Sequence, residues 1–286
     1  MKLVCTISAV REAVAAARGD GSAIGLVPTM GALHEGHLAL VRRAREQCGF
    51  VGVSIFVNPT QFGPAEDLTR YPRALDADSE MCREAGVDLI FAPDAQEMYP
   101  DAFDSWVEVG GVTEMLEGEF RPGHFRGVAT VCLKLFNIFQ PDRAYFGLKD
   151  YQQLAVIRKM ARDLDLPSEI VPIETVREPD GLAISSRNRY LSPDQRRAAL
   201  VLSKSLAEAK AAFDSGERDA SAIQSLVQAC LNSEPLAAID YAVVVDAETL
   251  LPIERIGRPA VILLAVRIGA TRLIDNLLLP SLNPQP

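Results

Sequence analysis

The sequence lacks any apolar run that approaches the roughly 20 residues of a membrane-spanning helix. Its first residues, Met1–Ile7, form only a short apolar run that leads into a predicted helix by Ala9. A secretory signal peptide would show a longer apolar region followed by small residues at a cleavage site. These absences lead us to expect a cytoplasmic protein without a membrane partner.

Cysteine is too sparse and too scattered to suggest a disulfide framework. The cysteines are odd in number and far apart, and most lie in apolar runs, which favours buried thiols over disulfides or zinc ligands. They are Cys5, Cys48, Cys82, Cys132 and Cys230. Histidine is rarer still: the chain has 3, yet His34 and His37 stand close together.

Basic residues are in the minority, with 29 Lys and Arg against 38 Asp and Glu and a formal net charge of −9. Nucleic-acid binding depends on Lys and Arg that neutralise phosphates, so this balance argues against a nucleic-acid partner. Local cationic pockets remain compatible with it. The 286 residues, 48% of them hydrophobic, are enough to bury a sizeable core and suggest about two domains.

Strands and helices alternate through residues 2–93. Short apolar runs between turn residues predict strands, and apolar residues at helical spacing predict helices. The predicted strands are Leu3–Ile7, Ala23–Pro28, Val51–Val57 and Asp88–Ala92, and the predicted helices are Ser8–Arg18, Gly36–Cys48 and Asp76–Ala85. Further strands are expected at 142–146 and 169–173, and a helix at 151–162. This order predicts an α/β, Rossmann-like parallel sheet with helices on both faces and a ligand crevice at the carboxyl ends of the strands.

The alternation stops near residue 177, which predicts a second domain. Here we expect a long helix from Leu191 to about Phe213 and a helix Ala220–Leu231, then strands Asp240–Val245, Ala260–Arg267 and Arg272–Leu278. We therefore expect a catalytic domain at 1–176 and a smaller α+β lid domain with an antiparallel sheet at 177–286. The tail Pro280–Pro286 is expected to be loose.

The stretch Pro28–His37, with the sequence PTMGALHEGH, joins a predicted strand to a predicted helix through glycines. A helix N-terminus offers unpaired N–H groups and a positive dipole end to a phosphate, and Gly31 and Gly36 allow the backbone to turn closely. His34 and His37 would share one face of the first helical turn and donate hydrogen bonds to the same phosphate. The alternative is a capping histidine beside a solvated one. A metal site is disfavoured, because no third His or nearby Cys completes a ligand set.

Amide side chains follow the strand 51–57. Asn58 and Gln61 can each donate and accept hydrogen bonds, which suits a small substrate with hydroxyl and carboxylate groups. An Asx-Pro turn would explain Asn58 equally well, so the residues alone leave both interpretations open. Gln153, in the predicted helix 151–162, would face the same pocket with a second amide.

The turn Gly147-Leu148-Lys149-Asp150 follows the strand 142–146. Gly147 permits a close turn, Lys149 supplies a cation for phosphate, and Asp150 could cap the next helix or hold a magnesium-bound water. Four such residues are a weak signal in isolation.

The segment Ser185-Ser186-Arg187 combines two hydroxyls with a guanidinium that can hold phosphate oxygens in a fork. A serine N-cap beside a surface arginine would also explain it. A predicted loop before a helix contains Arg121, His124 and Arg126. These side chains could face a bound anion, or they could only hold the loop against the rest of the protein. We assign them no catalytic role.

The string Thr29–His37 resembles the signature of the pantothenate synthetase family, a variant of the His-x-Gly-His motif of the nucleotidyltransferase superfamily. The segments 120–128, 147–150 and 184–187 resemble the family's later motifs in the same order. The resemblance implies ATP-dependent, magnesium-dependent condensation of pantoate with β-alanine to pantothenate, AMP and diphosphate through pantoyl adenylate, in a homodimer.

The resemblance also implies a role for each site residue. His34, His37, Lys149 and Arg187 would be catalytic, and Gln61, Gln153 and Asn58 would bind pantoate. Gln61 would also contact β-alanine, with Tyr71 as a wall of the pocket. The ATP-binding residues would be Met30, Gly31, His34, Gly36, His37, Gly147, Leu148, Lys149, Asp150, Val176, Ile184, Ser185, Ser186 and Arg187. Magnesium would be held mainly by the ATP phosphates and Asp150.

Two positions depart from the family pattern. Leu148 stands where the family has Glu or Gln, which weakens any role for a polar side chain there. Ile184 replaces Met in the family's Met-Ser-Ser-Arg, a conservative change in a residue that contacts through its backbone.

Two other functions are compatible with a nucleotide site. An adenylyltransferase would join AMP to a phosphorylated acceptor, but such an acceptor should need more Arg or Lys near Asn58, Gln61 and Gln153. A non-catalytic, RNA-associated module is suggested only by kinship with tRNA synthetases, and the acidic charge counts against it. The absence of a persuasive Ser-His or Cys-His pair fits a reaction without a protein nucleophile.

Overall fold

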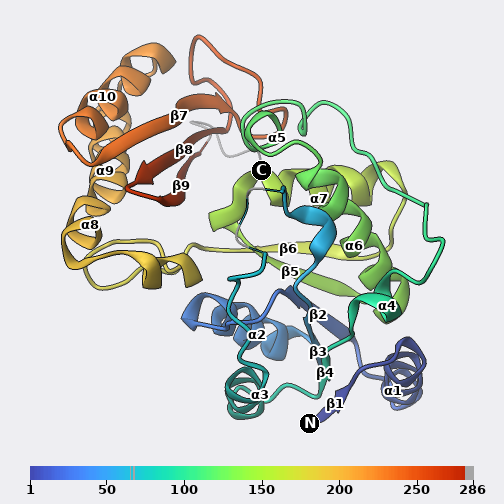
Figure 1. Ribbon diagram of the computed structural model, residues 1–286. Helices are drawn as coiled ribbons and strands as arrows, with labels where there is room; N and C mark the ends of the chain where they lie inside the picture. The colour runs from blue at the N-terminus through green and yellow to red at the C-terminus, as the bar shows by residue number, and fades with distance from the viewer. Residues whose placement is uncertain (65, 67, 281–286) are drawn as a thin grey trace. The chain divides into compact units, whose positions relative to one another are not determined.

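The computed structural model describes residues 1–64, 66 and 68–280, which form two compact units (Figure 1). The first unit contains residues 1–147 and 152–174. The second contains residues 148–151 and the described residues from 175 onward. The chain therefore passes between the units more than once.

A parallel sheet of six strands forms the centre of the first unit, as predicted. Its strands are β1 (Lys2–Val4), β2 (Ile24–Thr29), β3 (Phe50–Ile55), β4 (Leu89–Phe91), β5 (Arg143–Gly147) and β6 (Glu169–Ile173), in the order β1-β4-β3-β2-β5-β6. Thr29 pairs with Ile55 at the carboxyl ends of β2 and β3. The turns that follow these two strands therefore begin side by side at one edge of the sheet.

Helices cover both faces of this sheet. They are α1 (Ile7–Gly19), α2 (Glu35–Gln47), α3 (Leu75–Glu84), α4 (Ala95–Met98), α5 (Glu117–Phe120), α6 (His124–Phe139) and α7 (Tyr151–Asp163). Val51 and Val53 pack in one cluster with α2 and α3. Gly52 points to the opposite face, where a Cβ would lie 2.4 Å from Phe139 of α6. Gly52 therefore lets α6 pack closely on the face opposite α2.

Three differences from the sequence prediction stand out among smaller shifts of element ends. β1 ends at Val4, because Thr6 accepts a hydrogen bond from the Ala9 N–H and caps α1. The predicted helix 191–213 is two helices, α8 (Pro193–Ala198) and α9 (Leu200–Asp214). The histidine expected in a loop is the first residue of α6, so His124 and Arg126 belong to that helix.

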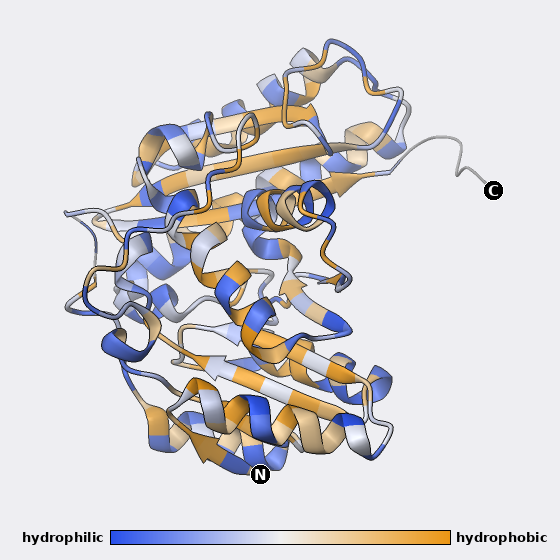
Figure 2. Ribbon diagram, turned by 90° about the vertical axis from the view of Figure 1, so that its right-hand side faces the viewer, coloured by the Kyte–Doolittle hydropathy of each residue, from blue (hydrophilic) through white to orange (hydrophobic). Residues whose placement is uncertain are grey.

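The second unit contains a small antiparallel sheet, as predicted, in the order β7-β8-β9. Its strands are β7 (Ala237–Asp246), β8 (Ala260–Ile268) and β9 (Thr271–Leu279), and its helices are α8, α9 and α10 (Ala220–Asn232). Short 3-10 turns lie at η2 (Leu148–Asp150) and η3 (Ser186–Tyr190), and η1 (Pro59–Gln61) lies in the first unit. Apolar residues of α9, α10 and the strands share one buried core, and Figure 2 shows hydrophobic strands in both sheets. Residues 281–286 of the tail predicted to be loose lie outside the described residues.

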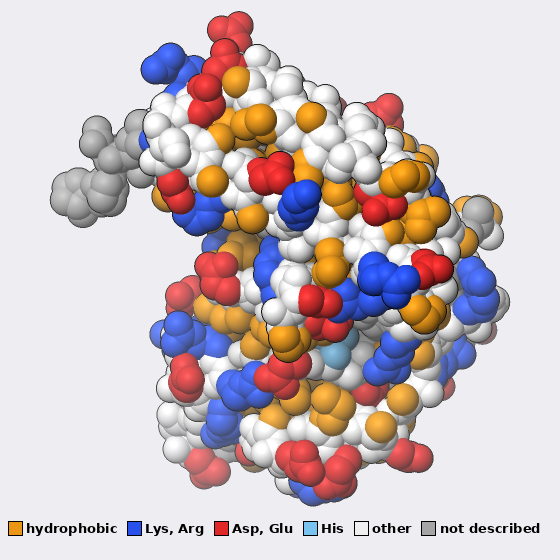
Figure 3. All heavy atoms as spheres, turned by 90° about the vertical axis from the view of Figure 1, so that its left-hand side faces the viewer, with side chains coloured by type: hydrophobic (Ala, Val, Ile, Leu, Met, Phe, Trp, Pro, Cys, Tyr) orange, Lys and Arg blue, Asp and Glu red, His pale blue; other side chains and the backbone are white. Residues whose placement is uncertain are grey.

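The surface and the cysteines agree with most of the composition-based expectations. All five cysteines are free thiols; Cys5 is exposed, contrary to the prediction, because it lies in the short connection before α1, and the other four are buried. Figure 3 shows acidic, basic and hydrophobic side chains interspersed on the face that it draws. In the described part of the chain, no helix has the length and apolar content to cross a membrane.

Candidate functional site

The turn between β2 and α2 is held by a buried carboxylate from another element. Asp78 of α3, with 2% of its surface exposed, accepts hydrogen bonds from the backbone N–H groups of Ala32 and Leu33, both at 2.8 Å. Gly31 has φ +83°, and a Cβ there would lie 3.0 Å from an Asp78 carboxylate oxygen. Thr29 Oγ1 adds a hydrogen bond to the Ser54 carbonyl at 2.7 Å. The turn is therefore fixed before any ligand binds.

His34 and His37 lie together at the N-terminus of α2. His34 is the N-cap residue, and its ring stacks on that of His37 with centroids 4.1 Å apart. The His34 N–H donates to His37 Nδ1 at 3.3 Å, so a neutral His37 carries its proton on Nε2. Gly36 leaves room for the His34 ring, because a Cβ would lie 3.0 Å from it. The arrangement gives an anion the helix N-terminus and an Nε2–H donor.

Gln61, Asn58 and Met30 form one group beside this turn. Asn58, 1% exposed, donates from Nδ2 to Gln61 Oε1 at 3.0 Å and to the Gly127 carbonyl at 3.2 Å. Its Oδ1 accepts from the Tyr99 hydroxyl at 2.8 Å. Gln61 Nε2 points at Met30 Sδ, 3.1 Å away. Asn58 thus uses its polar atoms on protein partners and fixes which way the Gln61 amide faces.

His124 packs behind this group with a neutral ring. Its Nδ1 lies 2.8 Å from the Gln61 carbonyl oxygen, and its Nε2 lies 3.1 Å from Nη1 of Arg121. Burial, with a smaller contribution from the Arg121 charge, lowers the pKa of His124 to about 4. Hydrogen bonding to Gln61 and the charges of Glu66 and Glu117 act on this pKa in the opposite direction. The imidazole is therefore uncharged at neutral pH.

In the second unit, β9 supports the turn that carries Lys149. Asn276 Nδ2 donates to the Leu148 carbonyl at 2.9 Å and to the Lys149 carbonyl at 2.8 Å. Lys149 Nζ lies 3.7 Å from Asp150 Oδ2, and both side chains keep some exposure. Leu148, which departs from the family pattern, is buried and contributes no polar group to the turn. The backbone of the turn is fixed while the ammonium group stays accessible to an anion.

The Ser185–Arg187 segment follows a short hairpin of the second unit. The Ile184 N–H donates to the Val176 carbonyl at 3.0 Å, and the Arg187 N–H donates to Ser185 Oγ at 3.3 Å. Arg177 ties the hairpin to β9 through a two-pronged ion pair with Asp275, at 2.7 and 2.8 Å. The half-buried side chains of Ser186 and Arg187 begin η3.

Several predicted residues are thus brought together within each unit. In the first unit His34 joins His37, and Met30 joins Gln61 and Asn58. Gln153 is half-buried near the start of α7, and Tyr71 is buried with its ring against Phe62. In the second unit, hydrogen bonds join Val176 to Ile184 and Ser185 to Arg187, and Lys149 lies beside Asp150. Gly147 is the last residue of β5 in the first unit.

Sequence reasoning missed the residues that hold these turns. Asp78 lies on the buried face of the predicted helix 76–85. A carboxylate at such a position needs a hydrogen-bond partner, and this was the one signal in the sequence that could have identified it. Asp275 and Asn276 fit an alternating strand and attract no attention there. Two consecutive polar residues that are both buried in a strand point to opposite faces and need partners on both.

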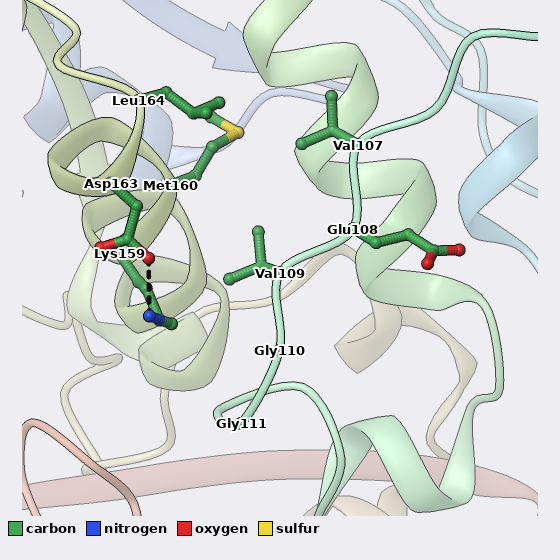
Figure 4. Close-up of a pocket in the computed structure, with 9 residues that line it drawn as sticks. All are labelled: Val107, Glu108, Val109, Gly110, Gly111, Lys159, Met160, Asp163 and Leu164. Carbon is green, nitrogen blue, oxygen red and sulfur yellow. Dashed lines mark hydrogen bonds and ion pairs between the residues drawn. The ribbon is translucent and has the colours of Figure 1, made fainter.

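A separate pocket of about 400 Å³ lies elsewhere in the first unit (Figure 4). Residues 107–111 line one side, and Lys159, Met160, Asp163 and Leu164 of the α7 end line the other. Lys159 and Asp163 form an ion pair at 2.6 Å. None of the predicted site residues lines it.

Comparisons with known proteins agree with the sequence motifs. The model of the Pantoate-beta-alanine ligase family matches residues 2–278. The chain belongs to this family. A pantothenate synthetase of Moorella thermoacetica is 56% identical over 279 residues, which cover 98% of this chain and 99% of that protein. This pantoate-beta-alanine ligase family therefore accounts for both units of the chain.

Solved structures of the pantoate-beta-alanine ligase family have the same fold. The pantothenate synthetase of Thermus thermophilus superposes with a TM-score of 0.92 at 49% identity, covering 97% of this chain and 99% of that one. The ligase of Francisella tularensis, complexed with β-γ ATP and β-alanine, gives a TM-score of 0.79 at 33% identity, with 97% of each chain covered.

Proposed function

We propose that this enzyme condenses pantoate with β-alanine, using ATP. The pantoate carboxylate attacks the α-phosphorus of ATP and expels diphosphate, giving pantoyl adenylate. The β-alanine amine then attacks the acyl carbon, releasing AMP and pantothenate. Membership of the pantoate-beta-alanine ligase family supports the reaction, and the stacked His34 and His37 at the α2 N-terminus are the observation that carries its assignment to this site.

The histidine pair would act on the ATP phosphates. His37 Nε2–H and His34 would donate to the α-phosphate and to the leaving oxygens, where negative charge grows during attack. Asp78 would keep the Gly31–Leu33 backbone in place, and Gly31, Met30 and Gly36 would allow ATP to approach closely. Catalysis would then rest on alignment and charge stabilisation, without a covalent enzyme intermediate.

Amide groups would hold the other substrates. Gln61 would bind the hydroxyl and carboxylate groups of pantoate and contact β-alanine, and Gln153 would add a second amide. Asn58 would contribute by orienting Gln61, since its Nδ2 already donates to Gln61 Oε1. Tyr71 would form a wall of this pocket.

Residues of the second unit would bind ATP as well. Lys149 and Arg187 supply positive charge, Ser185 and Ser186 supply hydroxyls, and the remaining contacts come from backbone and apolar groups. These remaining residues are Gly147, which ends the first unit's β5, with Leu148, Val176 and Ile184.

Mg²⁺ would be carried mainly by the phosphates and neutralise their charge, with Asp150 reaching a bound water. Among residues 1–64, 66 and 68–280, no group of three or more His, Cys, Asp or Glu is arranged to hold a metal ion. The single carboxylate of Asp150, partly exposed beside Lys149, fits a metal that arrives with its nucleotide.

We also propose that residues 1–176 form the catalytic domain and that 177–286 act as a lid. The working enzyme would be a homodimer in the cytoplasm, where ATP is plentiful and the five free thiols would stay reduced.

Diphosphate release tests this function directly. With Mg-ATP and pantoate but no β-alanine, we expect release of about one diphosphate per site, and sustained release once β-alanine is added. A phosphate ester of similar size, offered in place of pantoate, should give none. Release that depends on the phosphate ester would instead identify an adenylyltransferase.

A further inference from the structure

The η1 turn that presents Gln61 is weakly held by its own backbone. The Gln61 N–H lies 3.5 Å from the Asn58 carbonyl, and the Phe62 N–H lies 3.4 Å from the Pro59 carbonyl. Both distances are at the long end for hydrogen bonds. Side chains therefore help to set the geometry of Gln61: Asn58, at the start of the turn, holds its amide, and further contacts come from outside the turn.

Helix α6 supplies those contacts at two points. Gly127 brings the helix so close that a Cβ there would lie 2.4 Å from the Thr60 carbonyl oxygen, and its own carbonyl accepts from Asn58 Nδ2. One helical turn earlier, His124 Nδ1 lies 2.8 Å from the Gln61 carbonyl oxygen, the shorter of that oxygen's two polar contacts.

The hydrogen-bond partners of His124 determine its tautomer. A carbonyl oxygen only accepts, so Nδ1 must carry a proton to bond with Gln61. A guanidinium only donates, so Nε2 must be unprotonated to accept from Arg121 Nη1 at 3.1 Å. Glu66 holds Arg121 in that position by accepting from Nε and Nη2, both at 2.7 Å. The ring is thus oriented from both sides.

We propose that His124 is a positioning residue for substrate binding: held as the Nδ1–H tautomer by Arg121, it fixes the Gln61 carbonyl and so aims the Gln61 amide at pantoate. The inference rests on the proposed function, because that function makes Gln61 a pantoate ligand. Residues 121–124 would then contribute to substrate binding without contacting the substrate themselves.

Two substitutions of the same residue separate positioning from mere packing. His124→Asn keeps an N–H donor close to the place of Nδ1, whereas His124→Gln puts its donor near the place of Nε2. We expect His124→Gln to raise the KM for pantoate about tenfold, as expected for one lost hydrogen bond to a buried carbonyl. His124→Asn should restore it to within about threefold of the original value, with the KM for ATP unchanged in both. Arg126→Gln, which alters the exposed arginine on the same helix, serves as the control.

Equal pantoate KM values for His124→Asn and His124→Gln would overturn the proposal. Gln61→Ala provides the link to the proposed function. If it raises the pantoate KM, adding His124→Gln to it should change that KM little further, because both act through one side chain. If Gln61→Ala leaves the pantoate KM unchanged, the assignment of Gln61 fails, and the proposal with it. A normal response to Gln61→Ala with no response to His124→Gln rejects the positioning role alone.

Nitrogen-15 NMR reads the tautomer in the unmodified enzyme, and a variant serves only to assign the signals. The chain has 3 histidines, so the imidazole spectrum is small, and the signals lost in His124→Asn identify His124. We expect a protonated Nδ1 and an unprotonated Nε2 throughout the range from neutral pH to about pH 5.5, consistent with the orienting contacts. A neutral ring that carries its proton on Nε2 and not on Nδ1 would refute the proposed tautomer.

Discussion

The turn after β2 and the segment before η3 are assigned the same task, contact with ATP phosphates, but they are held in different ways. Ala32 and Leu33 are fixed by Asp78, a buried carboxylate from a helix more than forty residues further along the chain. Ser185 and Arg187 are joined to each other, and their support comes from a hairpin and a 3-10 turn close in sequence. A distant buried carboxylate contacts the first directly. The second is held directly by local hydrogen bonds, and it reaches a distant buried carboxylate, Asp275, only through Arg177 of its hairpin.

This difference suggests a division of labour. A site that stabilises charge during reaction must be in place beforehand, which favours the turn with buried, distant support. A segment held by local and half-exposed contacts opens at lower cost, which suits a group that closes on a nucleotide and releases it. Substitutions in each region test whether the two differ in this way.

The largest effect is expected at the fixed turn. His37→Ala removes the Nε2–H donor that we propose acts on the reacting phosphate, so kcat should fall by about 10² to 10³. Thermal stability should change little, because the side chain is only half-buried. Steady-state kinetics and a melting curve measure both. Near-normal turnover in this variant would place the chemistry elsewhere.

The pH dependence of stability should also reflect the first unit. The folded pKa of His124 is about 4, below its ordinary 6.5, so the unfolded chain takes up a proton between these values and the folded chain does not. This group's contribution is fully present above pH 6.5 and is lost as pH falls towards 4, at a total of about 3 kcal/mol. Urea unfolding at several pH values measures it. His124→Asn should unfold with a flatter pH profile, and an unchanged profile would count against the neutral ring.

Removal of Asp78 should show how much the fixed turn depends on distant support. Asp78→Ala leaves two buried N–H groups without their acceptor, and we expect the free energy of unfolding to fall by about 2 kcal/mol. The KM for ATP should rise at the same time, because the Gly31–Leu33 backbone is released. Asp76→Ala, on the exposed side of the same helix, is the matched control. A variant that loses stability but keeps its KM for ATP would show that the turn does not need to be held.

Features that depend on residues close in the chain were predictable from the sequence, and features that depend on distant residues were not. The parallel sheet was predictable because apolar strands and turn residues are local signals, and so was the proximity of His34 to His37, which lie within one helical turn. The support of the turn was not, since Asp78 meets Ala32 only through the packing of α3. The orientation of the His124 ring was equally hidden: Arg121 lies close by in the chain, but the second partner, the Gln61 carbonyl, meets the ring only through the packing of α6.

The smallest effect is expected at the locally held segment. Ser185→Ala removes one acceptor for the Arg187 N–H at 3.3 Å, so the free energy of unfolding should fall by about 1 kcal/mol or less, as for other lost caps. Ser192→Ala removes a comparable cap at the start of α8, and Ser192 has no proposed phosphate contact. Ser185→Ala should therefore raise the KM for ATP more than Ser192→Ala does. Chemical unfolding and ATP titrations of the two variants provide the comparison. If Ser185→Ala destabilised the protein as much as Asp78→Ala does, the segment would be as firmly built as the turn after β2, and a closing motion there would lose its physical basis.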